Sequence, residues 1–209
     1  MMTSAITFSL LSLFIAGDAQ TVNVSGQIIL PNKTLDVTMM IPVVTASCEP
    51  NFQKLQHKIK YYNSSGKKIA LQPDEIEEIK FSYNGKDIRM QSRPNSVESG
   101  NFLSSGRRIL LKLEVDGKLK MFNYYYTQSS PGVYNPASRV RTGVFNQTTT
   151  QGILEKDGVL KQPNKKNFKK DMSNYFSDCP LLAQKIAGNE LSEENLIEIV
   201  ELYNTNCDQ

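Results

Sequence analysis

The chain has 209 residues, of which 24 are Lys or Arg and 21 are Asp or Glu, so the net charge at pH 7 is +3. Because both signs are interspersed along the sequence, this composition excludes the strongly basic surface that is typical of nucleic-acid-binding proteins. A single histidine excludes any metal site built from several imidazoles.

The N-terminal residues have the pattern of a cleavable signal peptide. An apolar run of about twelve residues, 5–16, is followed by small residues that end at Ala19, where a signal peptidase would read them. We predict that residues 1–19 are removed by cleavage between Ala19 and Gln20. A membrane anchor is the less favoured alternative, because a bilayer-spanning helix needs about 20 apolar residues. The mature chain is therefore expected to be exported and to have no transmembrane span.

Export also changes how the three cysteines are interpreted, because thiols tend to pair in an oxidising compartment. Cys179 stands at the start of one predicted helix and Cys207 at the end of the next, and an antiparallel helical pair brings these two ends together. We predict a Cys179–Cys207 disulfide. Cys48 is then left over, and a buried free thiol is favoured over a reactive or intermolecularly paired one.

The first part of the mature chain alternates between apolar and polar residues, as strands do. Residues 21–41 are predicted to form a hairpin that turns at 31–33, and residues 57–71 a second hairpin that turns at 63–66. Residues 42–56 between them lack this periodicity, so a loop or a partly helical crossover is expected there.

Asn84-Gly85 is the clearest local signal, because this dipeptide is the preferred centre of a two-residue hairpin turn. That register places Phe81 opposite Ile88 on an apolar face. It also places Lys80 opposite Arg89, which is a small unfavourable interaction.

Another hairpin, residues 108–126, turns at Asp116-Gly117. A two-residue loop would place Leu113 opposite Lys120, whereas a loop one residue longer pairs Leu113 with Met121. It would also pair Val115 with Leu119, Ile109 with Tyr125 and Glu114 with Lys120. Because a slip of one residue reverses the face of every side chain, we predict the longer loop.

Aromatic residues crowd the second strand of this hairpin, with Phe122, Tyr124 and Tyr126 on the face opposite Tyr125. We favour a central strand that is covered on both faces over an exposed binding strip. If the strip is exposed, the candidate binding surface consists of Phe122, Tyr124, Tyr126 and Tyr134. Residues 127–138 are expected to be a polar loop, after which strands resume at 141–146 and 152–160.

Beyond Gln162 the apolar period lengthens to that of a helix. Helices are predicted at 167–176, Pro180–Ala187 and 193–203, the last with an apolar stripe of Leu196, Ile197, Val200 and Tyr203. The expected fold class is α+β, mainly β. An antiparallel sheet or small open barrel of hairpins forms residues 20–162, and a helical region, 163–209, packs on the same domain.

The C-terminal residues also carry a resemblance. The segment from Tyr175 to Leu181, YFSDCPL, the residue Leu191, and the segment from Ile197 to Cys207, IEIVELYNTNC, are similar to a group of secreted Bacteroidota proteins without an assigned activity. Upstream, the segments beginning at Gly26, Lys58 and Leu71 match the same group. The resemblance implies a bacterial envelope setting, and its motifs are structural.

Few residues of this chain are candidates for catalysis. His57 is the one available imidazole base, and with Cys48 it would form a Cys/His pair. Neighbouring carboxylates, such as Glu193 and Glu194, are explained by a helix N-terminus, which favours negative charge. The sequence contains no Gly-rich phosphate motif, calcium loop or Cys-x-x-Cys pair, so no cofactor or metal is expected. Lys165, Lys166, Lys169 and Lys170 are predicted to be a solvated helix face, with membrane-surface binding as the alternative.

The leading hypothesis is therefore a non-enzymatic binding or structural module of the cell envelope, either secreted, periplasmic or outer-membrane associated. It would bind another envelope protein or component through a sheet edge or the loop at 127–138, and no nucleic acid. Two alternatives stay open: a small hydrolase-like enzyme that uses Cys48 and His57, and an amphiphile-binding carrier with an empty barrel interior.

Overall fold

The computed structural model describes residues 20–97, 103, 106–130, 132, 134–137, 140–141, 143 and 145–207. The predicted signal peptide, including Ala19, lies outside these residues, and Gln20 is the first residue described. The backbone carbonyl of Gln20 accepts a hydrogen bond of 2.8 Å from the N–H of Val43. The first described residue is therefore already held against the folded body.

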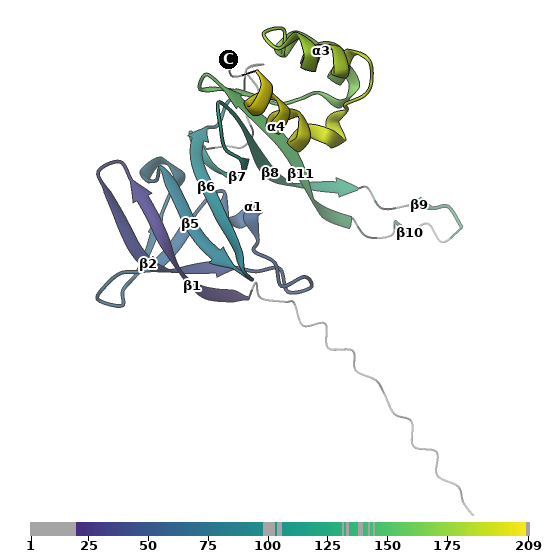
Figure 1. Ribbon diagram of the computed structural model, residues 1–209. Coiled ribbons are helices and arrows are strands. Elements are labelled where there is room, and N and C mark those ends of the chain that lie inside the picture. The colour runs from purple at the N-terminus through teal and green to yellow at the C-terminus, as the bar shows by residue number, and fades with distance from the viewer. Residues whose placement is uncertain are drawn as a thin grey trace, which may run out of the picture.

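Ten strands form one open antiparallel sheet in the described part of the chain, which confirms the mainly β, α+β class (Figure 1). The strands are β1 (Thr21–Leu30), β2 (Lys33–Pro42), β3 (Ile59–Tyr62), β4 (Lys68–Leu71), β5 (Glu78–Tyr83), β6 (Lys86–Pro94), β7 (Arg108–Val115), β8 (Leu119–Ser130), β11 (Phe145–Lys156) and β12 (Val159–Lys161). Their order across the sheet is β12-β11-β8-β7-β6-β5-β1-β2-β3-β4. A separate two-stranded sheet consists of β9 (Tyr134–Asn135) and β10 (Val140–Arg141).

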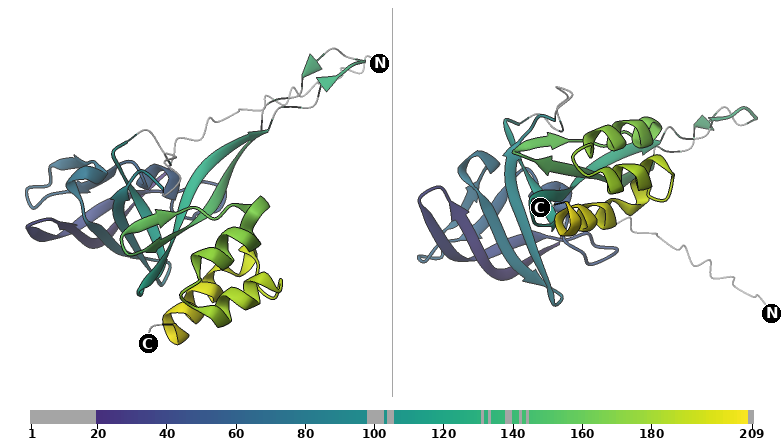
Figure 2. Two further views of the ribbon diagram at one scale, coloured as in Figure 1. Left: turned by 90° about the horizontal axis from the view of Figure 1, so that it is seen from above. Right: turned by 45° about the horizontal axis from the view of Figure 1, so that its top comes forward.

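The helices lie where the sequence predicts them. The crossover between β2 and β3 contains the short helix α1 (Phe52–Leu55), and a 3₁₀ turn, η1 (Pro73–Glu75), precedes β5. The C-terminal region packs on the sheet (Figure 2). It consists of η2 (Lys165–Asn167), α2 (Phe168–Tyr175), α3 (Pro180–Ala187), η3 (Glu193–Asn195) and α4 (Leu196–Asn206).

The prediction that Ile197 belongs to the buried apolar stripe of α4 is wrong. Ile197 is 49% exposed, and Ile199 is buried in its place beside Val200 and Tyr203. The reason is the helical period: Leu196, Ile199, Val200 and Tyr203 follow the i, i+3, i+4, i+7 spacing of one helix face, and Ile197 lies beside that face.

The β5–β6 hairpin has the predicted register, with Phe81 opposite Ile88 and Lys80 opposite Arg89. The expected repulsion between the two cations is offset by Glu78, whose carboxylate accepts from Arg89 Nε at 2.6 Å and lies 3.5 Å from Lys80 Nζ. The guanidinium of Arg89 also reaches Asp116 at 2.8 Å.

The predicted register of the β7–β8 hairpin is wrong. Leu113 pairs with Phe122 and Val115 with Met121, and the register shifts between the two pairs at Glu114. The predicted pairing of Glu114 with Lys120 does not form either, because this residue is the bulge. A bulge adds one residue to one strand, so Leu113 and Val115 pack on opposite faces of the sheet. Both therefore reach apolar neighbours, which no bulge-free register allows.

The expected loop at 127–138 and the expected break between strands at 141–146 and 152–160 are also wrong. β8 continues to Ser130, and β11 is one strand of 12 residues that pairs with β8 along its whole length. Thr127, for example, pairs with Thr148. The sequence hides this part of the two strands because residues 127–130 and 146–151 are polar on both faces, so no apolar alternation marks them.

β7 joins two halves of the sheet, because its two ends pair with different strands. Residues 108–112 pair with β6, whereas residues 112–115 pair with β8. Figure 1 shows the result, with β1, β2, β5 and β6 in one half and β8 and β11 with the helices in the other. Separate apolar clusters fill the first half and each face of the second.

Gln56 fills the gap where β7 and β8 separate. If the Lys112–Asn123 pairing continued, Leu110 would face Tyr125, but Gln56 lies between them. Its side-chain Nε2 donates to the Tyr125 carbonyl at 2.9 Å, and its Oε1 accepts from the Tyr125 N–H at 2.6 Å. Its own carbonyl accepts from the Leu110 N–H at 3.1 Å. This fully buried side chain therefore replaces a strand and connects the two halves.

Replacing Gln56 with leucine should destabilise the protein strongly. Gln56→Leu leaves the N–H and the carbonyl of Tyr125 unpaired in the interior, and each such group costs about 1–3 kcal/mol. We expect the free energy of unfolding, measured by chemical denaturation, to fall by about 2–5 kcal/mol.

Gln53→Ala is the matched control, because Gln53 also hydrogen-bonds to β8, through the exposed hydroxyl of Thr127 at 2.7 Å. Water can replace that bond, so the expected loss is below about 1 kcal/mol. Equal losses for the two variants would contradict the role assigned to Gln56.

Candidate functional site

The predicted aromatic strip is buried at one end and half-exposed at the other. Phe122 is fully buried beside Ile109 and Ile153, whereas Tyr124 and Tyr126 are half-buried. The rings of the two tyrosines stack with centroids 5.7 Å apart. Burial of the Tyr124 hydroxyl raises its pKa, and this hydroxyl donates a hydrogen bond to the Leu103 carbonyl. Tyr134 lies apart from the other three in β9, so a binding role for all four together stays a prediction.

The opposite face of β8 is covered by α1. The ring of Tyr125 stacks on Phe52 with centroids 4.9 Å apart, and Lys112 Nζ lies 5.2 Å from the centroid of the Phe52 ring. Burial is the main cause that raises the pKa of Tyr125, to about 12, with the nearby charge of Glu114 acting in the same direction. This face is therefore part of the core rather than a binding surface.

Beyond Tyr126, β8 and β11 continue as a two-stranded ribbon that leads away from the body towards β9 and β10 (Figures 1 and 2). The side chains of residues 127–130 are all exposed, and so are those of 146–148. Ser129 donates a hydrogen bond of 2.7 Å to the side chain of Asn146 across the ribbon. None of residues 127–130 and 145–150 is charged or a proline, and all of them except Phe145 are polar.

The structure brings no contact between Cys48 and His57. Cys48 is exposed in the loop after β2, where its φ is 54°, so the prediction of a buried thiol is wrong. Its carbonyl accepts a hydrogen bond of 2.6 Å from the Tyr83 hydroxyl. His57 is exposed just after α1, and within the residues described no hydrogen bond joins the two side chains. A hydrolase built on this pair stays a prediction.

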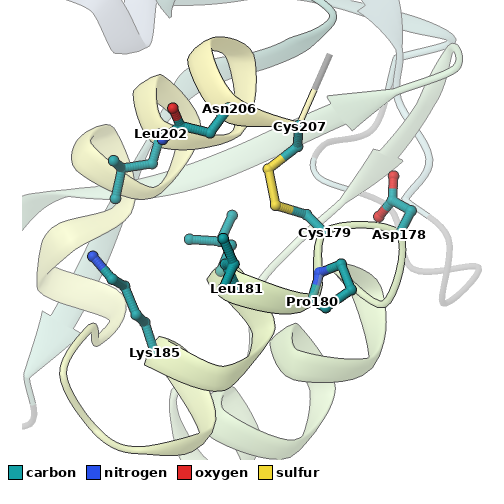
Figure 3. A pocket seen from close by; sticks show the side chains of 9 residues that line it. Asp178, Cys179, Pro180, Leu181, Lys185, Leu202, Asn206 and Cys207 are labelled. Carbon is teal, nitrogen blue, oxygen red and sulfur yellow. A yellow bond between two sulfur atoms is a disulfide. The ribbon is translucent and has the colours of Figure 1, made fainter. Parts of the chain in front are cut away.

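The predicted disulfide is confirmed, since Cys179 and Cys207 are bonded with their Cα atoms 5.5 Å apart (Figure 3). It joins the start of α3 to the end of α4, as the antiparallel helical pair requires. In the chain-entropy description, closing a loop of 28 residues stabilises the fold by about 3.5 kcal/mol.

A charged contact beside the disulfide ties the helices to the sheet. The carboxylate of Asp178 accepts from Lys156 Nζ at 2.6 Å and from the Tyr203 hydroxyl at 2.5 Å. Lys156 is the last residue of β11, and its ammonium lies 5.1 Å from the centroid of the Tyr203 ring and 5.4 Å from that of Tyr175. Burial of Asp178 opposes its ionisation, but the hydrogen bonds from Lys156 and Tyr203 outweigh it and lower the pKa of the carboxyl.

A cavity of about 480 Å³ lies between α3 and α4 next to the disulfide. Figure 3 shows Leu181 and Lys185 of α3 and Leu202 of α4 pointing into this space. Leu181 is 75% exposed, which is unusual for a residue beside a core. The lining of the cavity has one carboxylate, that of Asp178, which forms an ion pair with Lys156. The cavity can therefore hold an apolar group.

A second cavity was missed by the sequence analysis, because its residues converge only in the fold. Its volume is about 310 Å³, and four of its lining residues are lysines from α1, β3, β4 and the segment before β3. The full lining is Thr21, Met40, Pro42, Lys54, Lys58, Lys60 and Lys68. The sequence signal was only the run Lys58-Ile59-Lys60, which alternates as any surface strand does.

No group of three or more His, Cys, Asp or Glu side chains that could hold a metal ion occurs among the described residues. The helices of the same part of the chain are all too short or too polar to cross a membrane. Comparisons with protein-family models, with curated proteins and with solved structures found no match to this chain.

The stability that Asp178 contributes should depend on pH. Because its pKa is lowered in the folded state, its contribution is present above the unfolded pKa of about 4 and is lost as the pH falls through the lower folded pKa. Asp178→Asn should therefore cost about 1 kcal/mol at pH 7, as expected for a partly exposed ion pair. Denaturation at several pH values should show this difference shrinking below about pH 4.

Leu181→Ala is the control variant, since it changes an exposed neighbour without removing a charge. Its free energy of unfolding should differ little from that of the unchanged protein, and this small difference should be the same at every pH. A difference for Asp178→Asn that stays constant down to the acid range would contradict the assignment.

Proposed function

We propose that this protein is an exported, non-enzymatic binding module of the cell envelope, either secreted, periplasmic or outer-membrane associated. The signal-peptide pattern of residues 1–19 supports export. The Cys179–Cys207 disulfide is consistent with an oxidising compartment.

The projecting ribbon of β8 and β11 carries the binding part of the proposal. An isolated two-stranded hairpin is marginally stable in water, and none of the three apolar clusters reaches residues 127–130. Because apolar packing does not stabilise the ribbon, we expect it to be kept for another role. Its projecting position favours contact with a partner.

The free edges of the ribbon indicate how a partner would bind. β7 has left β8 before Tyr125, and β12 pairs only with residues 154–156 of β11, so both outer edges lack a described neighbouring strand. Sheet edges are usually protected from other chains by Lys or Pro. Residues 127–130 and 145–150 contain neither, so the partner would add an extended segment through backbone hydrogen bonds.

Shortening the ribbon tests this proposal. Gln128 and Gln147 are paired, so an Asn-Gly turn can replace residues 129–146 without changing the register. We expect the purified protein to retain a partner from the envelope fraction of its own cells and the shortened variant to lose it.

Leu181→Ala is again the control, because it alters an exposed apolar residue outside the ribbon and should leave the capture unchanged. Thermal denaturation checks that the shortened variant still folds, as expected from the distance of the ribbon from the clusters. If the unchanged protein, the shortened variant and Leu181→Ala all captured the same proteins, this would argue against a role for the ribbon.

Intact-mass analysis of protein from its own cells tests export. We expect a chain that begins at Gln20, with a mass lower by the hydrogens lost in forming one disulfide. Recovery of a chain that retains Met1, with Cys179 and Cys207 reduced, would contradict the proposal.

A further inference from the structure

The cavity lined by four lysines is a site that the proposed function does not use. Lys54 comes from α1, Lys58 from the segment before β3, Lys60 from β3 and Lys68 from β4. Two strands pair so that Lys60 lies opposite Ala70 and Lys68 opposite Tyr62, which puts both lysines on the same outer face. Tertiary structure therefore concentrates four positive charges that the sequence spreads over 15 residues, from 54 to 68.

Among the described residues, no carboxylate compensates this charge. The lining of the cavity contains no Asp or Glu. Within the described residues, none of the four lysines forms an ion pair, whereas Lys80, Lys112 and Lys156 each have a carboxylate partner. Like charges held near one another repel, so this arrangement is stabilised by whatever anion occupies it.

Two simpler explanations account for only part of the cluster. Lysines protect sheet edges, and β4 is an edge strand, but this does not explain Lys54 or Lys58. A solvated surface explains Lys165, Lys166, Lys169 and Lys170, because they lie within one short segment. The first group differs, since lysines from separate elements converge on one open pocket.

We propose that this cavity binds a phosphate group of a phosphate ester. Phosphate offers up to two negative charges and several acceptor oxygens, and ammonium groups bind it well. Met40 and Pro42 add an apolar wall, which suits the organic part of an ester, and the Thr21 hydroxyl adds a further donor. The group could belong to a soluble ester or to the headgroup of a lipid.

Binding measurements on the purified protein test this site. The probes are inorganic phosphate, glycerol 3-phosphate and vesicles of phosphatidylglycerol, with phosphatidylcholine vesicles as the neutral comparison and chloride at equal ionic strength. We expect one or more of the three phosphate probes to bind. Lys58→Gln combined with Lys60→Gln should weaken that binding about tenfold or more, because hydrogen bonds to charged groups contribute that much to affinity.

Lys33→Gln combined with Lys86→Gln is the matched control, since it removes the same charge at two exposed hairpin ends outside the cavity. It should change the affinity little. Binding of soluble probes identifies a soluble ester, and binding of phosphatidylglycerol vesicles alone identifies a headgroup. An equal loss in both double variants, or no binding of any phosphate probe, would overturn the proposal.

The two proposals can fail separately, because they use different surfaces. The variant with the shortened ribbon keeps all four lysines and should bind phosphate as the unchanged protein does. Loss of phosphate binding on shortening the ribbon would place the site elsewhere.

Discussion

The fold depends on one buried amide. β7 and β8 separate after a few pairs, and Gln56 occupies the opening with hydrogen bonds to Leu110 on one side and to Tyr125 on the other. Without it, two half-sheets with separate cores would share only the middle of β7. Because Gln56 satisfies the backbone groups of Tyr125, β7 does not have to pair with β8 beyond Asn123. The outer edge of β8 is then unpaired where the ribbon begins.

The helical region has a different kind of attachment. Apolar residues of α2, α3 and α4 cover β8 and β11, and the disulfide then fixes α3 to α4. Asp178 links this unit to Lys156 at the end of β11. The covered part of the long hairpin is therefore held from both faces, and its continuation past Tyr126 is not, which separates a rigid scaffold from a surface available to a partner.

Local chemistry made much of this structure predictable. Asn84-Gly85 sets the β5–β6 register, and Pro180 and Gly188 bound α3 as expected. The bulge at Glu114, the wedge of Gln56 and the convergence of Lys54 with Lys68 could not be predicted, because each depends on contacts between distant elements. The polar ribbon was also missed, since only an apolar face gives a strand its recognisable alternation.

The hydrogen bond between Gln20 and Val43 bears on the order of the proposed cleavage after Ala19 and the folding of β1. Proteases need an accessible, flexible segment, yet the proposed scissile bond directly precedes a residue that is pinned to the body. If the chain is cleaved at that position, as proposed, removal of residues 1–19 has to come before β1 pairs with β2. In that case the protease would act on an unfolded precursor, and a precursor that folded too early would keep its leader.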